Sequence, residues 1–259
     1  MHRHFPETIA RLEQGPTRPP VFLHEALAGD EIPSPCGGRA WLITRQADGL
    51  VNEAGAIRKR LQRRLAPGSE VHQRLTALAR REDLGPHHLL FLDIETTGLS
   101  NAPLFLIGTL ECQPGGLLVR QYFARDYSEE SAVTSLFLDQ LTRDHVLVSF
   151  NGRTFDLRYI RERAAVHGLR CRFPQPHLDL LHWSRRAWKF QLPNCRLQTL
   201  EQCICKRLRH GDIPGHLIPE AYHSYVRTGD ATEMVQVIEH NLLDLLTMAD
   251  LLARLPGPG

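Results

Sequence analysis

The chain has 259 residues, 42% of them hydrophobic and 23% charged, which is typical of a globular protein able to form a substantial core. No apolar run approaches the roughly 18 residues of a membrane span, and the amino terminus lacks the apolar segment of a signal peptide. The six cysteines include no Cys-x-x-Cys pair, so we expect reduced thiols in a cytoplasmic protein. A net charge of +2 does not by itself indicate a nucleic-acid partner.

Residues 1–82 are predicted to form an amino-terminal extension, partly proline-rich and partly basic and helical. Much of the proline-rich stretch at 1–36 is expected to be extended or poorly ordered. A short strand at 39–46 and two helices at 55–66 and 69–82 are expected to follow it. Residues 57–82 carry eight Lys or Arg against two Glu. Positive charge is therefore concentrated just ahead of the first acidic motif.

Residues 87–255 are predicted to form an α/β domain, which opens on an unbroken apolar run typical of a buried central strand. The predicted strands are 87–94, 104–112, 117–125, 145–150 and 176–180. The predicted helices are 128–142, 154–167, 180–190, 197–206 and a last one ending at 255, with Ser128 and Asp230 as caps of the first and the last. This order predicts a mixed sheet, three antiparallel strands then parallel strands, flanked by helices.

The segment FLDIETTGLS at 91–100 places two acidic side chains at the end of the buried strand. Residues two apart in a strand project to the same face, so the Asp93 and Glu95 carboxylates are neighbours that repel unless cations or protons neutralise them. A surface Asp-x-Glu pair is common. The five identities of Asp-x-Glu-Thr-Thr-Gly, however, occur by chance only on the order of once in three million starts. The run therefore indicates a functional site, and the turn after it offers backbone amides to a phosphate or sugar.

Two further aspartates lie where their charge needs a partner. Asp156 falls in the first turn of a predicted helix, where the helix dipole stabilises a carboxylate by about 0.3–1 kcal/mol, so a structural role is the alternative there. Asp244 lies between two pairs of leucines in a helix that is apolar on nearly every side. A buried carboxylate without a partner is costly, so Asp244 requires a cation, a donor or a proton. Beside the first motif, we interpret both aspartates as metal ligands.

These residues resemble the DEDD, or DnaQ-like, superfamily of 3′–5′ exonucleases, named for four acidic residues on a ribonuclease H-like fold. Within it, the chain is most similar to the YprB-type ribonuclease H-like domain, over about residues 87–255. The similarity lies in the segments FLDIETTGL (91–99), FNGRTFD (150–156), HLDLLH (177–182), GDIPGHLIPE (211–220) and EHNLLDLL (239–246).

The resemblance implies a divalent-metal-dependent 3′–5′ exonuclease that hydrolyses phosphodiester bonds of DNA or RNA by a two-metal mechanism. Two Mg²⁺ or Mn²⁺ ions are expected, because the implied ligands all supply oxygen. By this resemblance the metal ligands are Asp93, Glu95, Asp156 and Asp244. The candidate contacts to the 3′ end of the nucleic acid are Thr96, Thr97, Gly98, Leu99, Asn151 and Arg153.

His240 is the candidate general base. In the superfamily that the chain resembles, a histidine base precedes the last aspartate by five residues and a tyrosine base precedes it by four. Here a histidine stands at the four-residue spacing, His240 before Asp244. Imidazole, with an ordinary pKa near 6.5, is suited to taking a proton from water. A structural histidine within the helix packing is the alternative.

Two other functions stay open, a non-catalytic nucleic-acid-binding module and a structure-directed endonuclease, because the same fold and ligands support both. Asp179 is interpreted as a helix cap. The cysteines at 195, 203 and 205 lack the spacing of zinc ligands and are interpreted as ordinary thiols. The basic cluster Lys206, Arg207 and Arg209 is expected on the solvated surface.

Overall fold

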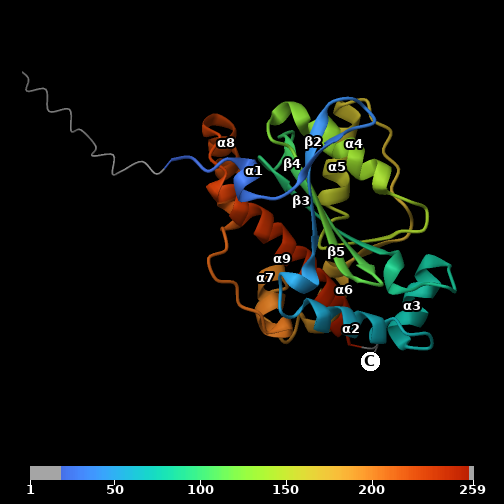
Figure 1. Ribbon diagram of the computed structural model, residues 1–259. Coiled ribbons are helices and arrows are strands. Elements are labelled where there is room, and N and C mark those ends of the chain that lie inside the picture. The colour runs from blue at the N-terminus through green and yellow to red at the C-terminus, as the bar shows by residue number, and fades with distance from the viewer. Residues whose placement is uncertain (1–18, 257–259) are drawn as a thin grey trace, which may run out of the picture.

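The computed structural model describes residues 19–256. Its centre is a seven-stranded sheet with the order β1-β2-β5-β4-β3-β6-β7, and helices lie on both of its faces (Figure 1). The strands are β1 (Asp30–Pro33), β2 (Arg39–Gln46), β3 (Leu89–Thr96), β4 (Leu104–Gln113), β5 (Gly116–Phe123), β6 (Val146–Ser149) and β7 (His177–Asp179). The helices are α1 (Leu23–Ala26), α2 (Ala54–Arg64), α3 (Glu70–Ala79), α4 (Glu130–Gln140), α5 (Asp156–Val166), α6 (Leu180–Trp188), α7 (Leu197–Leu200), α8 (Ile218–Thr228) and α9 (Thr232–Arg254).

The sheet is mixed. Strands β3, β4 and β5 form an antiparallel meander, whereas β6 pairs in parallel with β3 and β7 pairs in parallel with β6. The meander turns at Gln113 and Gly116, which are cross-strand partners, as the Gln-Pro-Gly-Gly segment predicts. The prediction of an α/β fold with three antiparallel strands followed by parallel strands is confirmed.

Residues 19–82 pack closely on this sheet. Strand β2 pairs with β5, and β1 pairs with β2. Helix α2 lies along α9, where Arg60 donates to Asp250 at 2.7 Å. Residues 30–33 form a strand, which is extended chain, whereas residues 23–26 form a short helix, so the expectation of extended or poorly ordered chain was wrong for 23–26. The part of that expectation that concerns residues 1–18 lies outside the described residues. The boundary between an extension and a domain stays a prediction.

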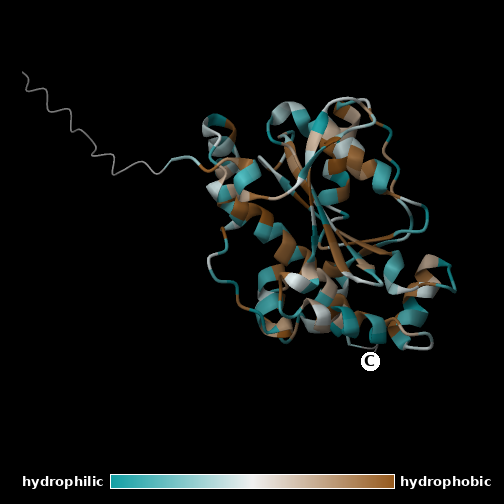
Figure 2. Cartoon of the chain, viewed as in Figure 1, coloured by the Kyte–Doolittle hydropathy of each residue, from teal (hydrophilic) through white to brown (hydrophobic). Residues whose placement is uncertain are grey.

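The apolar residues of β3 alternate between two core clusters. Leu90 and Leu92 contact one cluster, which includes residues of α4 and α5, and Leu89 and Phe91 contact the other, which includes residues of α2, α6 and the second half of α9. Brown, apolar ribbon accordingly lines the strands and the helix faces turned toward them (Figure 2). Because side chains two apart share a face, Asp93 continues the Leu89–Phe91 row and points toward α9.

Some local elements differ from the sequence-based predictions. The turn before α4 is capped by the Asp126 carboxylate rather than by Ser128, whose own N–H donates to Asp126 at 2.7 Å. Helix α8 was not predicted, and the helix predicted at 197–206 is the short α7 followed by a π-helical turn, Glu201–Cys205. In the part of the chain from 19 to 256, no helix combines the length and apolar character needed to cross a bilayer.

Candidate active site

Asp93 and Glu95 lie side by side near the carboxyl end of β3, on the face covered by α9. The strand pairs regularly with β4 up to Glu95, and the register then shifts before Thr96. Both acidic side chains remain partly exposed. Even so, burial by the surrounding protein is the largest cause that raises their pKa values well above the ordinary range.

Asp156 reaches the same place from the start of α5. It is 5% exposed, and burial raises its pKa to about 7. The loop from β6 to α5 passes so close that a Cβ on Gly152 would lie 2.1 Å from Ser149 Oγ and 3.0 Å from Asp156 Oδ2. Asn151 takes up a left-handed conformation with φ of 64° at the same turn. A glycine at 152 is therefore required to bring the aspartate to the end of the strand.

Asp179, at the end of β7, fixes this loop from the other side. Its carboxylate accepts the N–H of Asn151 at 2.8 Å and of Arg153 at 3.2 Å, and it also caps α6 by accepting from Leu181 at 3.1 Å. The interpretation of Asp179 as a helix cap agrees with these contacts. The contacts also hold Asn151 and Arg153 in place next to Asp156.

A row of cross-strand partners positions Asp93. Asp93 pairs with Gly108 of β4, and Gly108 pairs with Gln121 of β5. Asn241 of α9 packs against Gly108 so closely that a Cβ there would lie 2.0 Å from Asn241 Oδ1. Its amide donates to Asp93 Oδ2 at 2.8 Å and accepts from Gln121 Nε2 at 2.8 Å. Asn241 thus holds one oxygen of Asp93 and leaves the other to face the neighbouring acids.

Sequence reasoning missed this group of Gly108, Gln121 and Asn241. The only signal was that each interrupts an otherwise apolar strand or helix. Both polar members are fully buried, so each needs a hydrogen-bond partner inside the protein. Which partner each takes depends on the register of the sheet and on where α9 crosses it.

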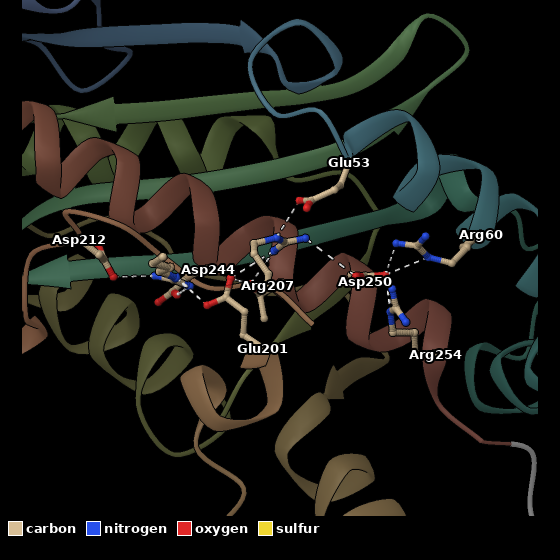
Figure 3. Close-up of polar contacts among 10 residues, drawn as sticks. Glu53, Arg60, Glu201, Arg207, Asp212, Asp244, Asp250 and Arg254 are labelled. Carbon is tan, nitrogen blue, oxygen red and sulfur yellow. Dashed lines mark hydrogen bonds and ion pairs between the residues drawn. The ribbon is translucent and has the colours of Figure 1, made fainter. Parts of the chain in front are cut away.

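Asp244, one turn after Asn241 on α9, is paired with an arginine. Arg209 donates to Asp244 at 2.5 Å, to Glu201 at 2.6 Å and to Asp212 at 3.2 Å. These contacts belong to a line of acidic and basic side chains along α9 that continues through Arg207 to Asp250 (Figure 3). The side chains of Arg207 and Arg209 are each only 7% exposed, so the expectation of a solvated surface was wrong for both.

His240 lies between two of these acids. Its Nδ1 is 2.9 Å from Asp212 Oδ1, and its Nε2 is 3.6 Å from Asp244 Oδ2. Asp212 therefore contacts both Arg209 and His240. Asp212 fixes the ring so that Nε2 points toward the acid group.

The four predicted ligands form one electrostatic unit. Burial is the largest cause that raises the pKa values of Asp93 and Glu95, and the charges of neighbouring carboxylates come next. For Asp93 these neighbours are Asp244, Glu95 and Asp156, and for Glu95 they include Asp244 and Asp156. The charge of Asp244 also adds to the raised pKa of Asp156. Burial raises the pKa of Asp244 itself, while Arg209 acts to lower it. Every pair among the four carboxyl groups thus repels, which is the arrangement that favours binding of cations or protons.

The turn after Glu95 is anchored but open to solvent. Thr96 Oγ1 donates to the carbonyl of Gly98 at 2.8 Å, and the N–H of Thr97 donates to Pro103 at 2.9 Å. The hydroxyl of Tyr159 also donates to Gly98, at 3.2 Å. Leu99 is 89% exposed at the tip of the turn. An apolar side chain held outward in this way is available to a ligand.

Within residues 19–256, no three His, Cys, Asp or Glu side chains approach closely enough to enclose a metal ion as they stand. The cationic group that contacts Asp244 is the guanidinium of Arg209. The donor set itself still fits Mg²⁺ or Mn²⁺, because Asp93, Glu95, Asp156 and Asp244 offer only oxygen atoms.

Comparisons with known proteins place these features in a family. Residues 90–255 match the model of the RNase_H superfamily. The chain is 30% identical over 172 residues to the uncharacterized protein YprB of Bacillus subtilis (strain 168), and the match covers 64% of this chain and 41% of that protein. The chain therefore spans less than half the length of this relative.

Three solved structures are similar to this chain at low sequence identity. A family B DNA polymerase from Pyrobaculum calidifontis is similar with a TM-score of 0.51 and 18% identity, over 63% of this chain and 24% of the polymerase. E. coli exonuclease I in complex with a dT13 oligonucleotide gives a TM-score of 0.35 and 15% identity, over 60% of this chain and 45% of that one. Brucella melitensis NrnC with bound Mg²⁺ gives a TM-score of 0.34 and 14% identity, over 63% of this chain and 84% of that one.

Proposed function

Because the chain belongs to the RNase_H superfamily, we propose that it is a metal-dependent 3′–5′ exonuclease that hydrolyses phosphodiester bonds of DNA or RNA. The family supports a nuclease-type function in general. The observation that carries the finer proposal is the meeting of Asp93, Glu95, Asp156 and Asp244, which come from three separate segments and raise one another's pKa values. Asn241 and Arg209 each donate to one of the four acids, and burial still raises the pKa values of all four. Such an arrangement favours the binding of cations.

Asp93, Glu95, Asp156 and Asp244 are the residues that would hold the metal ions. Two bound cations supply charge stabilisation to the attacking and leaving oxygens of an in-line displacement. Asn241 keeps one oxygen of Asp93 engaged, at 2.8 Å, which fixes the direction in which the other is offered. Asp156 is held by the β6–α5 loop, whose shape depends on Gly152.

His240 is proposed as the general base. Its Nδ1 is occupied by Asp212 at 2.9 Å, which leaves Nε2 to accept a proton from a water on the side of Asp244. A carboxylate bonded to one ring nitrogen fixes the tautomer and the orientation of the ring. The contact with Asp212 thus favours the catalytic interpretation, although a structural histidine would make the same bond.

The nucleic-acid 3′ end is proposed to lie against the turn at 96–99 and the loop holding Asn151 and Arg153. The backbone amides of the turn are suited to a phosphate or sugar. Leu99, 89% exposed, is placed to pack on the terminal base. Arg153 has its backbone fixed by Asp179, so its side chain extends from a rigid point beside Asp156.

The test is hydrolysis of end-labelled DNA, RNA and hybrid strands with Mn²⁺, by the wild-type protein and by Asp93→Asn. Asparagine keeps the size of the side chain but removes its charge, so we expect activity to fall at least about 100-fold while the fold survives in circular dichroism. Asp139→Asn, on an exposed position of α4, is the matched control and should be fully active. Stepwise trimming distinguishes an exonuclease from an endonuclease. Undiminished cleavage by Asp93→Asn would rule out the proposal.

One observation favours a second candidate, a non-catalytic nucleic-acid-binding module. Arg209 already neutralises Asp244, at 2.5 Å, and an arginine in that place competes with a cation. Binding of oligonucleotide without any cleavage over long incubation with Mn²⁺ would support this alternative. Cleavage that depends on Asp93 would exclude it.

A further inference from the structure

A basic groove lies between α3 and α6, outside the acid cluster. It has a volume of about 400 Å³ and is lined by Arg74, Leu78, His182, Trp183 and Arg186. The guanidinium of Arg74 lies 5.8 Å from the ring centre of Trp183, so the two helices meet through a cation–π contact. We call this surface the α3–α6 groove.

The positive charge of the groove is not neutralised by the protein. Among residues 19–256, neither Arg74 nor Arg186 forms an ion pair, and the same holds for Arg185 of α6 and for Lys189, which follows the helix. Helix α6, with the sequence LLHWSRRAW, contains no acidic residue. Arg207 and Arg209, by contrast, are each held by two or more carboxylates. The groove is therefore suited to an anionic ligand.

Aromatic rings lie within this positive surface. Trp183 is half-buried, so it presents part of its ring to the groove while the rest packs on the core. Phe190, two turns further along, is 90% exposed, and Lys189 Nζ lies 4.5 Å from its ring centre. Exposed aromatic rings among unpaired cations are the combination on which single-stranded nucleic acids stack their bases and place their phosphates.

Helix α6, which forms one side of the groove, begins beside the acid cluster. Asp179 caps α6 and at the same time holds the loop of Asn151 and Arg153 next to Asp156. At a rise of about 1.5 Å per residue, Trp183 lies about 6 Å and Arg186 about 10 Å along the helix from this cap. The groove residues of α6 thus lie on a helix that begins beside the acids, within reach of a strand whose end lies there.

We propose that the α3–α6 groove binds the single-stranded body of a nucleic acid whose 3′ end lies at the acid cluster. A base stacks on Trp183, and backbone phosphates contact Arg74 and Arg186. This inference rests on the proposed exonuclease function and adds a binding site to it. Arg74 belongs to a part of the chain outside residues 90–255, so the amino-terminal region contributes directly to substrate binding.

The test is binding of a fluorescently labelled 20-nucleotide oligothymidylate to the full chain in EDTA, followed by anisotropy. Arg186→Glu and Arg74→Glu are expected to raise Kd at least tenfold. Each should also reduce the slope of log K against log salt by about 0.7, the value for one phosphate contact on a single strand. Arg170→Glu is the matched control. Arg170 is exposed, lines a different cavity with Leu138, and forms no ion pair within 19–256, so its reversal should leave Kd within twofold.

Trp183 gives a second, independent readout. Trp183→Phe keeps a stacking ring and should bind nearly as well as wild type, whereas Trp183→Leu should weaken binding about tenfold with an unchanged circular dichroism spectrum. Equal Kd values for Arg186→Glu and Arg170→Glu would overturn the proposal. Competition by poly-glutamate as strong as that by unlabelled oligonucleotide would also overturn it, because the surface would then prefer acidic peptides.

The failure of this proposal can be separated from the failure of the proposed function. Hydrolysis of the p-nitrophenyl ester of thymidine 5′-monophosphate with Mn²⁺ reports on the acid cluster alone, because this ester is too short to reach Trp183. If Asp93→Asn abolishes that hydrolysis while Arg186→Glu binds the oligonucleotide normally, the groove proposal fails and the function stands. If binding depends on Arg186 but no ester is hydrolysed, the exonuclease proposal fails and the groove stands.

Discussion

Arg209 donates to Asp244 at 2.5 Å and so brings a guanidinium into contact with one of the four predicted metal ligands. Burial raises the pKa of Asp244, and the charge of Arg209 opposes that effect. The same guanidinium contacts Glu201 and Asp212, so it is shared among three carboxylates. In the metal-free protein, Arg209 thus supplies positive charge that a bound cation would otherwise supply.

Replacing Arg209 with glutamine is predicted to weaken the metal-free fold and strengthen metal binding. Removing one partner of a buried ion pair costs about 3–5 kcal/mol, because the other charge stays buried. The free energy of unfolding in EDTA, from urea denaturation, should fall by that amount. The affinity for Mn²⁺, from calorimetry, should rise because the competing cation is gone.

Arg158→Gln is the control for this comparison. Its side chain is 71% exposed and pairs with Glu162 on the surface of α5, so its loss should change the free energy of unfolding by less than about 0.5 kcal/mol. Weaker Mn²⁺ binding by Arg209→Gln would show that Arg209 supports the metal site and does not compete with it.

Gly108→Ala is predicted to displace Asn241 and with it the orientation of Asp93. The added Cβ would lie 2.0 Å from Asn241 Oδ1, so the helix or the amide must move. Overpacking of this kind costs about 1–3 kcal/mol, and a shift of a catalytic group by about 1 Å lowers the rate about 100-fold. Thermal denaturation and nuclease assays measure the two effects.

The matched variant is Gly115→Ala in the turn between β4 and β5. A Cβ there meets no atom within 4 Å, so stability and activity should both stay near the wild-type values. If Gly108→Ala behaved in the same way, Asn241 would not be needed to position Asp93.

The sequence revealed three of the four acids because each of them breaks a strong local pattern, whereas Asp156 stood out only beside the first motif. Asp93 and Glu95 follow an apolar strand, and Asp244 interrupts an apolar helix, so their need for a partner is visible without coordinates. The mixed sheet could be predicted for the same reason, since its strands are long apolar runs separated by turns. The roles of the acids as ligands stay a prediction.

Arg209 could not be placed from the sequence. The segment RLRHGD at 207–212 is polar and reads as surface. Its burial comes from the π-helical turn at Glu201–Cys205 and the left-handed Lys206, with φ of 59°, which together turn the chain back toward α9. Lysine rarely adopts a left-handed conformation, so the residue type at position 206 does not predict this turn. Tertiary contacts with Glu201 and Asp244 decide it.

The contribution of Asp93, Glu95 and Asp156 to the stability of the protein without metal is predicted to fall as the pH rises from about 4 to about 7. Burial, followed by neighbouring carboxylates, raises the pKa values of Asp93 and Glu95, and burial raises that of Asp156 to about 7. Each group therefore binds its proton more tightly in the folded state than in the unfolded state, where its pKa is about 4. The stabilisation is complete below about pH 4 and is lost as the pH passes the folded pKa.

Asp156→Asn isolates this effect, because asparagine does not titrate. The free energy of unfolding of both proteins is measured by urea denaturation in EDTA. Relative to Asp156→Asn, the wild type should be less stable at pH 7.5 than it is at pH 5. Added Mn²⁺ should reduce that pH dependence, since a cation binds the deprotonated acid. A difference that does not vary with pH would show that Asp156 has an ordinary pKa.

His240→Ala is predicted to lower kcat by about 10²–10⁴, the usual contribution of a general base. Because Nδ1 is bound to Asp212 at 2.9 Å, Asp212→Asn should also lower kcat, with KM little changed, since the orientation of the ring is no longer fixed. A merely structural histidine would lower stability without altering kcat. His216→Ala, on an exposed position before α8, is the control and should keep both kcat and stability. Full activity in His240→Ala would show that another group takes the proton. The four-residue spacing between His240 and Asp244 would then have no catalytic role.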